Sequence, residues 1–177
     1  DTPYNSGYKG AAQSPTRGYV AGARGPSGNN SSDIQVVTFS SKGNSVKFGD
    51  LTSDRSDMVT GTSNSTTGIF SIGNNTGMTN EEGSAVKQID KLNLASSGNA
   101  VSFGELHKAR ERCGGASNQT RAIFAGGFGH PGGSFAYASG IDSVTIASSG
   151  GAVDFGEMSA KGQFGATSDS HGGLGGY

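Results

Sequence analysis

Hydrophobic positions in this chain recur with a long period rather than a helical one. Three segments align without a gap, and each has an isoleucine at its start and a phenylalanine 14 positions later: Ile34–Leu51, Ile89–Leu106 and Ile141–Met158. Phe48 of the first segment recurs 55 residues later as Phe103 and a further 52 residues later as Phe155. A strand-containing repeat of this length is typical of a β-propeller blade or a related array.

Four short strand-like pieces are expected in each repeat, because β-branched and aromatic residues gather in them. Val46 and Phe48 are two residues apart in one such piece, which predicts that their side chains share one face. Glu105–Arg112 is the best helix candidate, and we expect a connector or short turn there. The pieces are Gly18–Gly22, Ile34–Phe39, Ser45–Phe48 and Asp57–Ser63, with their counterparts in the other two repeats.

The pattern predicts one all-β array of four-stranded antiparallel repeats of about 52–55 residues, with three full repeats and partial blades at both ends. Residues 1–16 are a partial blade, 17–67, 68–120 and 121–171 are the three repeats, and 172–177 begin a further blade. A closed propeller has about four or more blades. The chain therefore closes on itself only if its end pieces complete a small fourth blade; otherwise it is part of a longer protein, or several chains complete one ring or stack.

Composition fits strands joined by tight turns and disfavours several partner classes. Glycine accounts for 32 of the 177 residues. A net charge of −1 offers no basic face for nucleic acid, and the chain has no run of about 18 apolar residues that would predict a membrane span. Cys113 is the only cysteine, so no intrachain disulfide forms, and we expect a small buried strand residue at this position.

Reactive side chains do not form a recognisable catalytic or metal-binding pattern. Gly127–Gly132 fits the dinucleotide motif GxGxxG, but no helix is expected after it, so we predict no nucleotide cofactor. The three histidines lack metal-ligand spacing, which predicts no metal site. Asp50, Glu105 and Glu157 recur after Phe-Gly, and one acid in each repeat favours a structural role. These observations favour a protein that is not an enzyme.

The loops are the better candidates for function, because the loop after the first strand of each repeat differs in length while the strands keep their register. Aromatic rings stack on sugars, and Asn or Glu side chains bond hydroxyl groups, so the loops could form a glycan-binding or protein-binding surface. The candidate ligand-binding residues are Arg24, Asn29, Asn30, Asn74, Asn75, Glu81, Phe128, His130, Phe135 and Tyr137.

The order of residues in the third repeat resembles that of kelch-type propeller repeats. Arg121 precedes an apolar strand that ends in Gly126-Gly127, and a variable loop, a second strand and an aromatic residue follow. The aromatic residue is Phe155, where kelch repeats usually carry Trp. Over Arg17–Leu174 the amino-acid sequence of the repeat more closely resembles kelch-like repeat proteins of tailed bacteriophages.

The phage resemblance implies a non-enzymatic virion structural protein, such as a tail-fibre, appendage or capsid-surface component. It implies a location on the particle surface, assembly with copies of itself or with other virion proteins, and contact with a host-surface glycan. An alternative is a carbohydrate-binding or adhesive extracellular β-propeller module that is not viral. A propeller glycan hydrolase is a third possibility.

Overall fold

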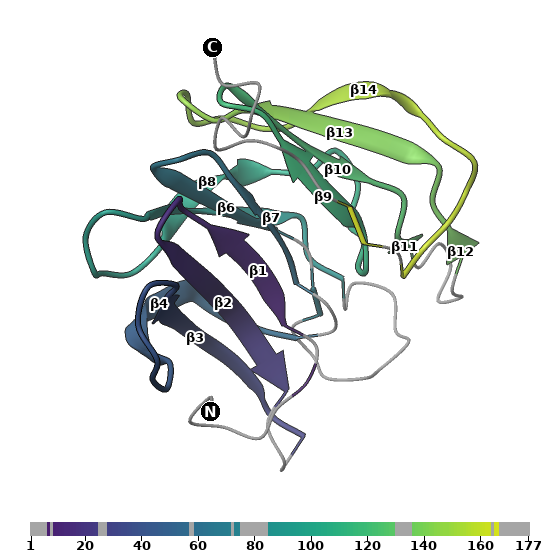
Figure 1. The fold of residues 1–177 in the computed structure, drawn as a ribbon. Helices are drawn as coiled ribbons and strands as arrows, with labels where there is room; N and C mark the ends of the chain where they lie inside the picture. The colour runs from purple at the N-terminus through teal and green to yellow at the C-terminus, as the bar shows by residue number, and fades with distance from the viewer. Residues whose placement is uncertain are drawn as a thin grey trace.

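Strands make up all the regular secondary structure of the described residues, as the computed structural model of the chain shows (Figure 1). The structure describes residues 7, 9–24, 28–56, 59–71, 73–74, 85–129, 136–163 and 165–166. Three sheets have four strands each and a fourth sheet has two. The expected all-β class, built from four-stranded antiparallel units, is confirmed.

Each large sheet is antiparallel, and its strands are ordered as they occur along the chain, except that the separate β11–β12 pair intervenes between two neighbouring strands of the third sheet. The first sheet contains β1 (Gly10–Gln13), β2 (Arg17–Arg24), β3 (Asn30–Thr38) and β4 (Val46–Arg55). The second contains β5 (Thr60–Ser63), β6 (Thr67–Ser71), β7 (Gln88–Asn93) and β8 (Val101–Glu105). The third contains β9 (Gly114–Ser117), β10 (Arg121–Ala125), β13 (Gly140–Thr145) and β14 (Val153–Glu157). The small sheet pairs β11 (Phe128–Gly129) with β12 (Ala136–Tyr137).

The fourth strand-like piece of each expected repeat joins the sheet that follows it. Thr60–Ser63 pairs with Thr67–Ser71, and Gly114–Ser117 pairs with Arg121–Ala125. Each sheet therefore begins one strand earlier than the repeat units delimited from the sequence. Glu105–Arg112 contains no helix and forms a connector from β8, as expected.

The turn between the first two strands of each sheet is built in the same way. The side-chain oxygen of Ser14, Asn64 or Asn118 accepts backbone N–H groups two and three residues ahead. Such local hydrogen bonds from Ser and Asn side chains to the backbone stabilise a tight turn. The turn fixes the register of each opening hairpin.

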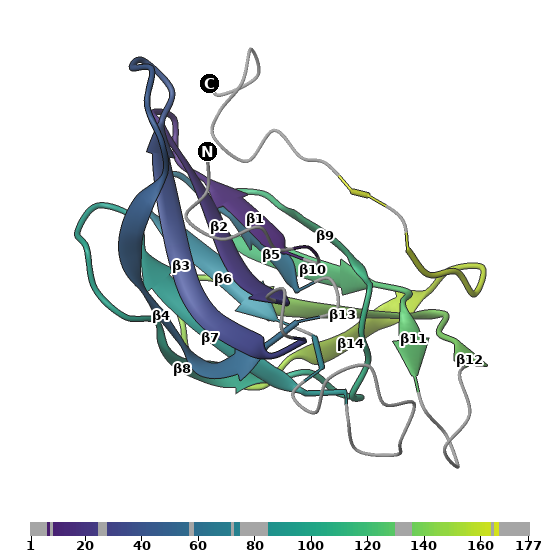
Figure 2. The same cartoon turned by 90° about the horizontal axis from the view of Figure 1, so that it is seen from below.

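The first strands of the three sheets lie next to one another, as Figure 2 shows for β1, β5 and β9. Their side chains are small, and hydroxyl groups join one sheet to the next. The Ser63 hydroxyl donates to the carbonyl of Gln13 at 2.7 Å, and the Ser117 hydroxyl donates to the carbonyl of Ser63 at 2.8 Å. The repeated small polar residues thus allow the backbones of successive sheets to approach closely.

Two hydrophobic cores fill the spaces between the sheets. One joins the first sheet to the second and includes Tyr19, Phe48 and Phe70, with the Tyr19 and Phe48 rings packed edge to face at 5.0 Å. The other joins the second sheet to the third and includes Phe103 and Phe124. The second sheet is therefore covered on both faces. Among the described residues the three sheets form an open series, and no closed ring is seen.

A β-bulge occurs at the same position in all three sheets. In β4 the pairing skips Phe48, because Ile34 faces Gly49 while Gln35 faces Lys47. The bulge interrupts the alternation of side chains along the strand. Val46 pairs with Val36, which packs against the same core as Phe48, as expected for two side chains on one face. The two nevertheless differ in exposure: Phe48 is 6% exposed and Val46 is 61% exposed.

A buried ion pair also recurs between successive sheets. Arg55 contacts Asp90 at 2.9 Å, and Arg110 contacts Asp142 at 2.7 Å. Arg55 is the last residue of β4, and Arg110 lies in the connector after β8. Asp90 in β7 and Asp142 in β13 each lie in the third strand of the next sheet. The same arginines donate to backbone carbonyls of the next sheet, namely those of Gln88 and Gly140. We call each of these arrangements an inter-sheet joint.

Each joint is completed by a backbone N–H group that donates to the same carboxylate. The donor is Thr52 for Asp90, at 3.0 Å, and His107 for Asp142, at 3.3 Å. Burial lowers the pKa of the Arg55 guanidinium, and the charge of Asp90 opposes this effect. A buried charge is costly unless it is paired in this way.

Removing one member of a joint should destabilise the protein strongly. We expect Asp90→Asn to lower the free energy of unfolding by about 3–5 kcal/mol, because it leaves the Arg55 guanidinium buried without its counter-ion. Urea denaturation followed by circular dichroism measures this change. Asp50→Asn is the matched control, since Asp50 pairs with Lys47 at the surface. Equal stability of the two variants would contradict the assigned role of the joint.

Candidate ligand-binding cavity

Two of the candidate aromatic residues are brought together by the small sheet. Phe128 faces Tyr137 across β11 and β12, and the ring centroids are 4.7 Å apart. The guanidinium of Arg112 lies 5.6 Å from the centroid of Phe128. Tyr137 is 62% exposed, so its ring offers a stacking surface to a ligand.

The other described candidates lie elsewhere, and two of them have structural roles. Asn74 is 2% exposed, and its amide group donates to Glu111 at 3.4 Å. Asn30 donates to the carbonyl of Asn74 and accepts a hydrogen bond from Ser56. These asparagines hold the ends of the sheets together. A ligand cannot reach Asn74 without a rearrangement of this contact.

Arg24 ends β2, and Asn29 is exposed just before β3. Both belong to the first sheet, so the structure does not group them with Phe128 and Tyr137. Four further candidates lie outside the described residues: Asn75, Glu81, His130 and Phe135.

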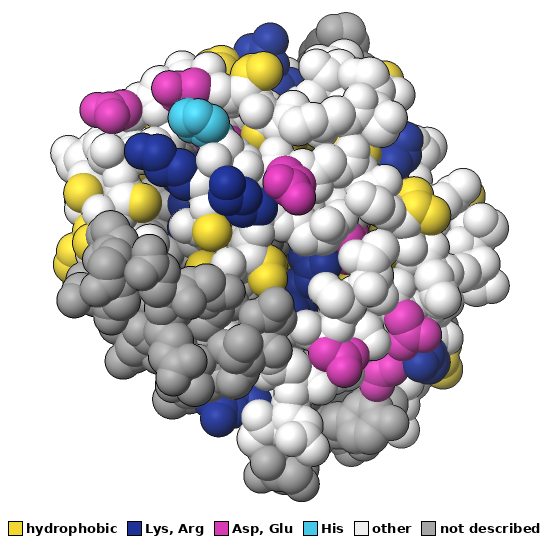
Figure 3. Space-filling model, turned by 180° about the vertical axis from the view of Figure 1, so that it is seen from behind, with side chains coloured by type: hydrophobic (Ala, Val, Ile, Leu, Met, Phe, Trp, Pro, Cys, Tyr) yellow, Lys and Arg dark blue, Asp and Glu magenta, His cyan; other side chains and the backbone are white. Residues whose placement is uncertain are grey.

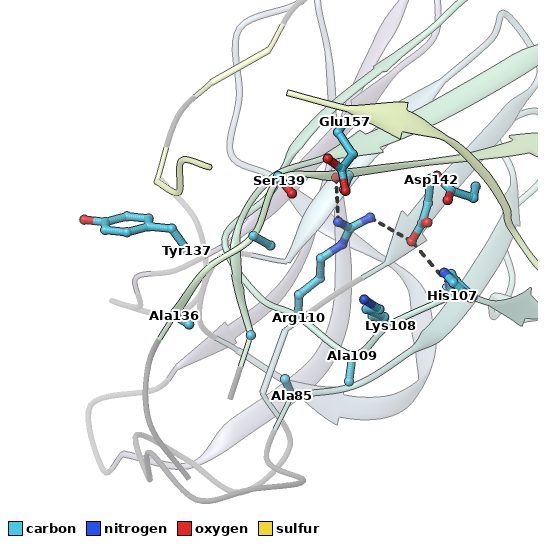
Figure 4. Close-up of a pocket in the computed structure, with 14 residues that line it drawn as sticks. Ala85, His107, Lys108, Ala109, Arg110, Ala136, Tyr137, Ser139, Asp142 and Glu157 are labelled. Carbon is cyan, nitrogen blue, oxygen red and sulfur yellow. Dashed lines mark hydrogen bonds and ion pairs between the residues drawn. The ribbon is translucent and has the colours of Figure 1, made fainter. Parts of the chain in front are cut away.

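A cavity of about 540 Å³ lies between the connector that follows β8 and the strands of the third sheet. This volume is within the range of small-molecule sites. Alanines at positions 85, 109, 136 and 138 leave room inside it. Figure 4 shows its polar side chains converging from the connector, β13 and β14. They are His107, Lys108, Arg110, Ser139, Asp142, Asp154 and Glu157, and Tyr137 completes the lining.

The second inter-sheet joint forms one wall of the cavity. Arg110 is held by Asp142 and by the carbonyl oxygens of Gly140 and Phe124. Figure 4 shows the Arg110 guanidinium directed toward Asp142, with the Glu157 side chain nearby and the Tyr137 ring pointing away from it. Because the pair is buried and both terminal nitrogens of the Arg110 guanidinium are hydrogen-bonded, the joint gives the cavity a fixed wall.

Outside this pair, the cavity carries one ammonium group, one imidazole and two carboxylates. Lys108 and His107 come from the connector, whereas Asp154 and Glu157 come from β14. Figure 3 shows the face that carries the histidine, where basic and acidic side chains are interspersed. The cavity can both donate and accept hydrogen bonds.

Sequence reasoning singled out only Tyr137 among these lining residues as a ligand contact. Asp154 occupies a repeat position that carries Lys47 and Ser102 in the other two sheets, so variation at this position is the signal that could have indicated it. Lys108 lies in a connector with mixed charges, and the sequence alone does not place it opposite β14.

In comparisons with known proteins, no protein-family model and no curated protein matches the chain. Within the described residues, no three His, Cys, Asp or Glu side chains are grouped in a way that could hold a metal ion. The same residues contain no helix long and apolar enough to cross a membrane.

Cys113 is buried as expected, but it lies immediately before β9 rather than within a strand. Its thiol donates to the carbonyl of Gly126 at 2.9 Å. Burial raises the pKa of the Cys113 thiol to about 12. The reactive thiolate is therefore scarce at neutral pH, and this cysteine is structural.

We expect the Cys113 thiol to resist a disulfide reagent at pH 8 in the folded protein and to react fully in concentrated urea. The absorbance of the released thiolate measures both rates. Ser97→Cys serves as the control, because residue 97 is exposed in a turn and its new thiol should react in the folded state. Rapid labelling of Cys113 in the folded parent chain would contradict its assignment as an inert, buried group.

Proposed function

We propose that this chain is a non-catalytic binding module of a virion surface, in which a propeller-type array of sheets presents a glycan-binding cavity. The cavity bounded by Lys108, Asp154 and Glu157 carries the binding part of the proposal. The repeated sheet order and the adjacent first strands support the propeller-type arrangement. Assembly with copies of itself or with other virion proteins belongs to the same proposal.

The chemistry of the cavity favours a neutral ligand with many hydroxyl groups. Carboxylates accept hydrogen bonds from sugar hydroxyls, and the Lys108 ammonium and Ser139 hydroxyl donate to sugar oxygens. The exposed ring of Tyr137 lies at the edge, where a further sugar unit can stack on it. A strongly anionic ligand would meet the two carboxylates of Asp154 and Glu157 against the single ammonium of Lys108, and this excess of negative charge disfavours it.

The placement on a phage particle rests on the resemblance of the repeat to kelch-like proteins of tailed bacteriophages. An adhesive extracellular module outside a virus would use the same cavity in the same way. The two alternatives differ in the source of the chain rather than in its binding chemistry. Detection of this chain in purified particles by mass spectrometry would support the viral placement, and its detection only in cell envelopes would contradict it.

Binding should depend on the polar residues of the cavity. We expect the parent chain to bind members of an array of bacterial surface polysaccharides, and Asp154→Asn and Lys108→Ala each to weaken binding about tenfold or more, through the loss of a charge-assisted hydrogen bond. Isothermal titration calorimetry with the best glycan measures the change. Asp54→Asn and Lys87→Ala are matched controls, because both residues are exposed and neither lines the cavity. Binding that all four substitutions leave unchanged would rule out the cavity as the site.

Incubation with the same glycan distinguishes a binding module from a glycan hydrolase. We expect no new reducing ends when the bound glycan is incubated with the parent chain, whereas Asp154 and Glu157 would be its candidate catalytic carboxylates. A reducing-sugar assay measures the product. Product that disappears in Glu157→Gln would overturn the non-catalytic proposal.

A further inference from the structure

The outer face of the third sheet has the features of a sheet-to-sheet interface that has no partner sheet. Phe48 and Phe103 occupy the bulge of the first and second sheets, and they are 6% and 4% exposed because the next sheet covers them. Phe155 occupies the same bulge of the third sheet and is 53% exposed. The guanidinium of Arg121 lies 5.5 Å from the ring centroid of Phe155, and a cation, Lys91, also lies over the buried ring of Phe103.

Backbone hydrogen bonds beside the bulge form a seam that joins the first sheet to the second and the second sheet to the third. The carbonyls of Phe48 and Asp50 accept N–H groups from Gly98 and Ala100 of the next sheet. The carbonyls of Phe103 and Glu105 likewise accept those of Gly150 and Ala152. The counterparts in the third sheet are the carbonyls of Phe155 and Glu157.

The glycine of the bulge shows how closely the sheets approach along this seam. A Cβ atom at Gly49 or Gly104 would overlap the carbonyl of Gly98 or Gly150 in the next sheet. At Gly156, no described atom lies within 4 Å of the same position. The third sheet therefore has open space where the first two sheets receive a neighbour.

The outer face of the first sheet is the matching half. In the second sheet, Phe70, Leu92 and Leu94 contact the first sheet, and their repeat counterparts in the first sheet are Val20, Val37 and Phe39. Phe39 is 57% exposed. Gly18 lies beside Val37 and Phe39, as Gly68 lies beside Phe70 and Leu94, so the three apolar side chains share one face.

The charges of the two faces are also matched. The position of Asp90 and Asp142 is occupied by Gln35 in the first sheet, and the position of Arg55 and Arg110 is occupied by Gly162 after the third. Gln35 is satisfied within its own sheet by the Ser45 hydroxyl at 2.8 Å. Both members of the buried ion pair are absent where these two faces would meet, so neither face would bury an unpaired charge.

We propose that the outer face of the third sheet, centred on Phe155, docks against the outer face of the first sheet of a second copy of this chain, centred on Phe39. The contact continues the interface that already joins the sheets within one copy. Two copies placed head to tail satisfy both faces at once and form a ring of six sheets, within the size range of propellers. This proposal does not depend on the glycan cavity.

The test measures the mass of the native full chain by light scattering after size exclusion, over a hundredfold range of concentration. We expect a mass about twice 17.7 kDa for the parent chain. Phe155→Asp and Phe39→Asp should each give a monomer, while Val101→Asp should not, because Val101 is an equally exposed strand residue on the middle sheet. Circular dichroism should show that all three variants fold, since each replaces a side chain that is more than half exposed.

An equimolar mixture of Phe155→Asp and Phe39→Asp should recover part of the dimer, because each variant contributes one unaltered face. A parent chain that stays monomeric throughout the range would overturn the proposal. So would a dimer that persists in both phenylalanine variants, or one that Val101→Asp also removes. Glycan binding is read separately, so failure of this proposal and failure of the proposed function can be distinguished.

Discussion

The inter-sheet joint is the constraint on which the rest of this structure depends. A charged guanidinium crosses from the end of one sheet to a carboxylate in the next, and both groups are buried. Such a pair stabilises a fold only when its geometry is closely satisfied. The backbone N–H and carbonyl groups of the joint supply that geometry, and the two hydrophobic cores pack around it. The joint thereby fixes how each sheet is placed against its neighbour.

The candidate binding site is a consequence of the same joint. Arg110 and Asp142 neutralise each other in one wall of the cavity, and this leaves Lys108, Asp154 and Glu157 to set its polarity. Arg110 and Asp142 thus both hold two sheets together and line the cavity, whereas Lys108 and Asp154 have different residues at the equivalent positions of the other repeats.

Several parts of the fold could be predicted from periodicity alone. Recurrence of Phe48 as Phe103 and Phe155 indicated a repeated four-stranded unit, because strands that share a pattern of apolar residues bury equivalent faces. Periodicity did not predict that Val46 is 61% exposed although it pairs with Val36 beside the core, because exposure depends on what packs against the side chain. The loop hypothesis identified Phe128 and Tyr137 as neighbours of a site but treated Asn74 as exposed, although tertiary contacts bury it.

The period, the class of secondary structure and the buried state of Cys113 could be read from the sequence, because they depend on local propensity and on residues that recur at fixed spacing. Only the tertiary structure decided which repeats contact each other and therefore which equivalent residues differ in environment. Phe103 and Phe155 occupy the same position in the repeat, yet one is 4% exposed and the other 53%. Burial is a property of what packs against a side chain, and that depends on the neighbouring sheet rather than on the residue.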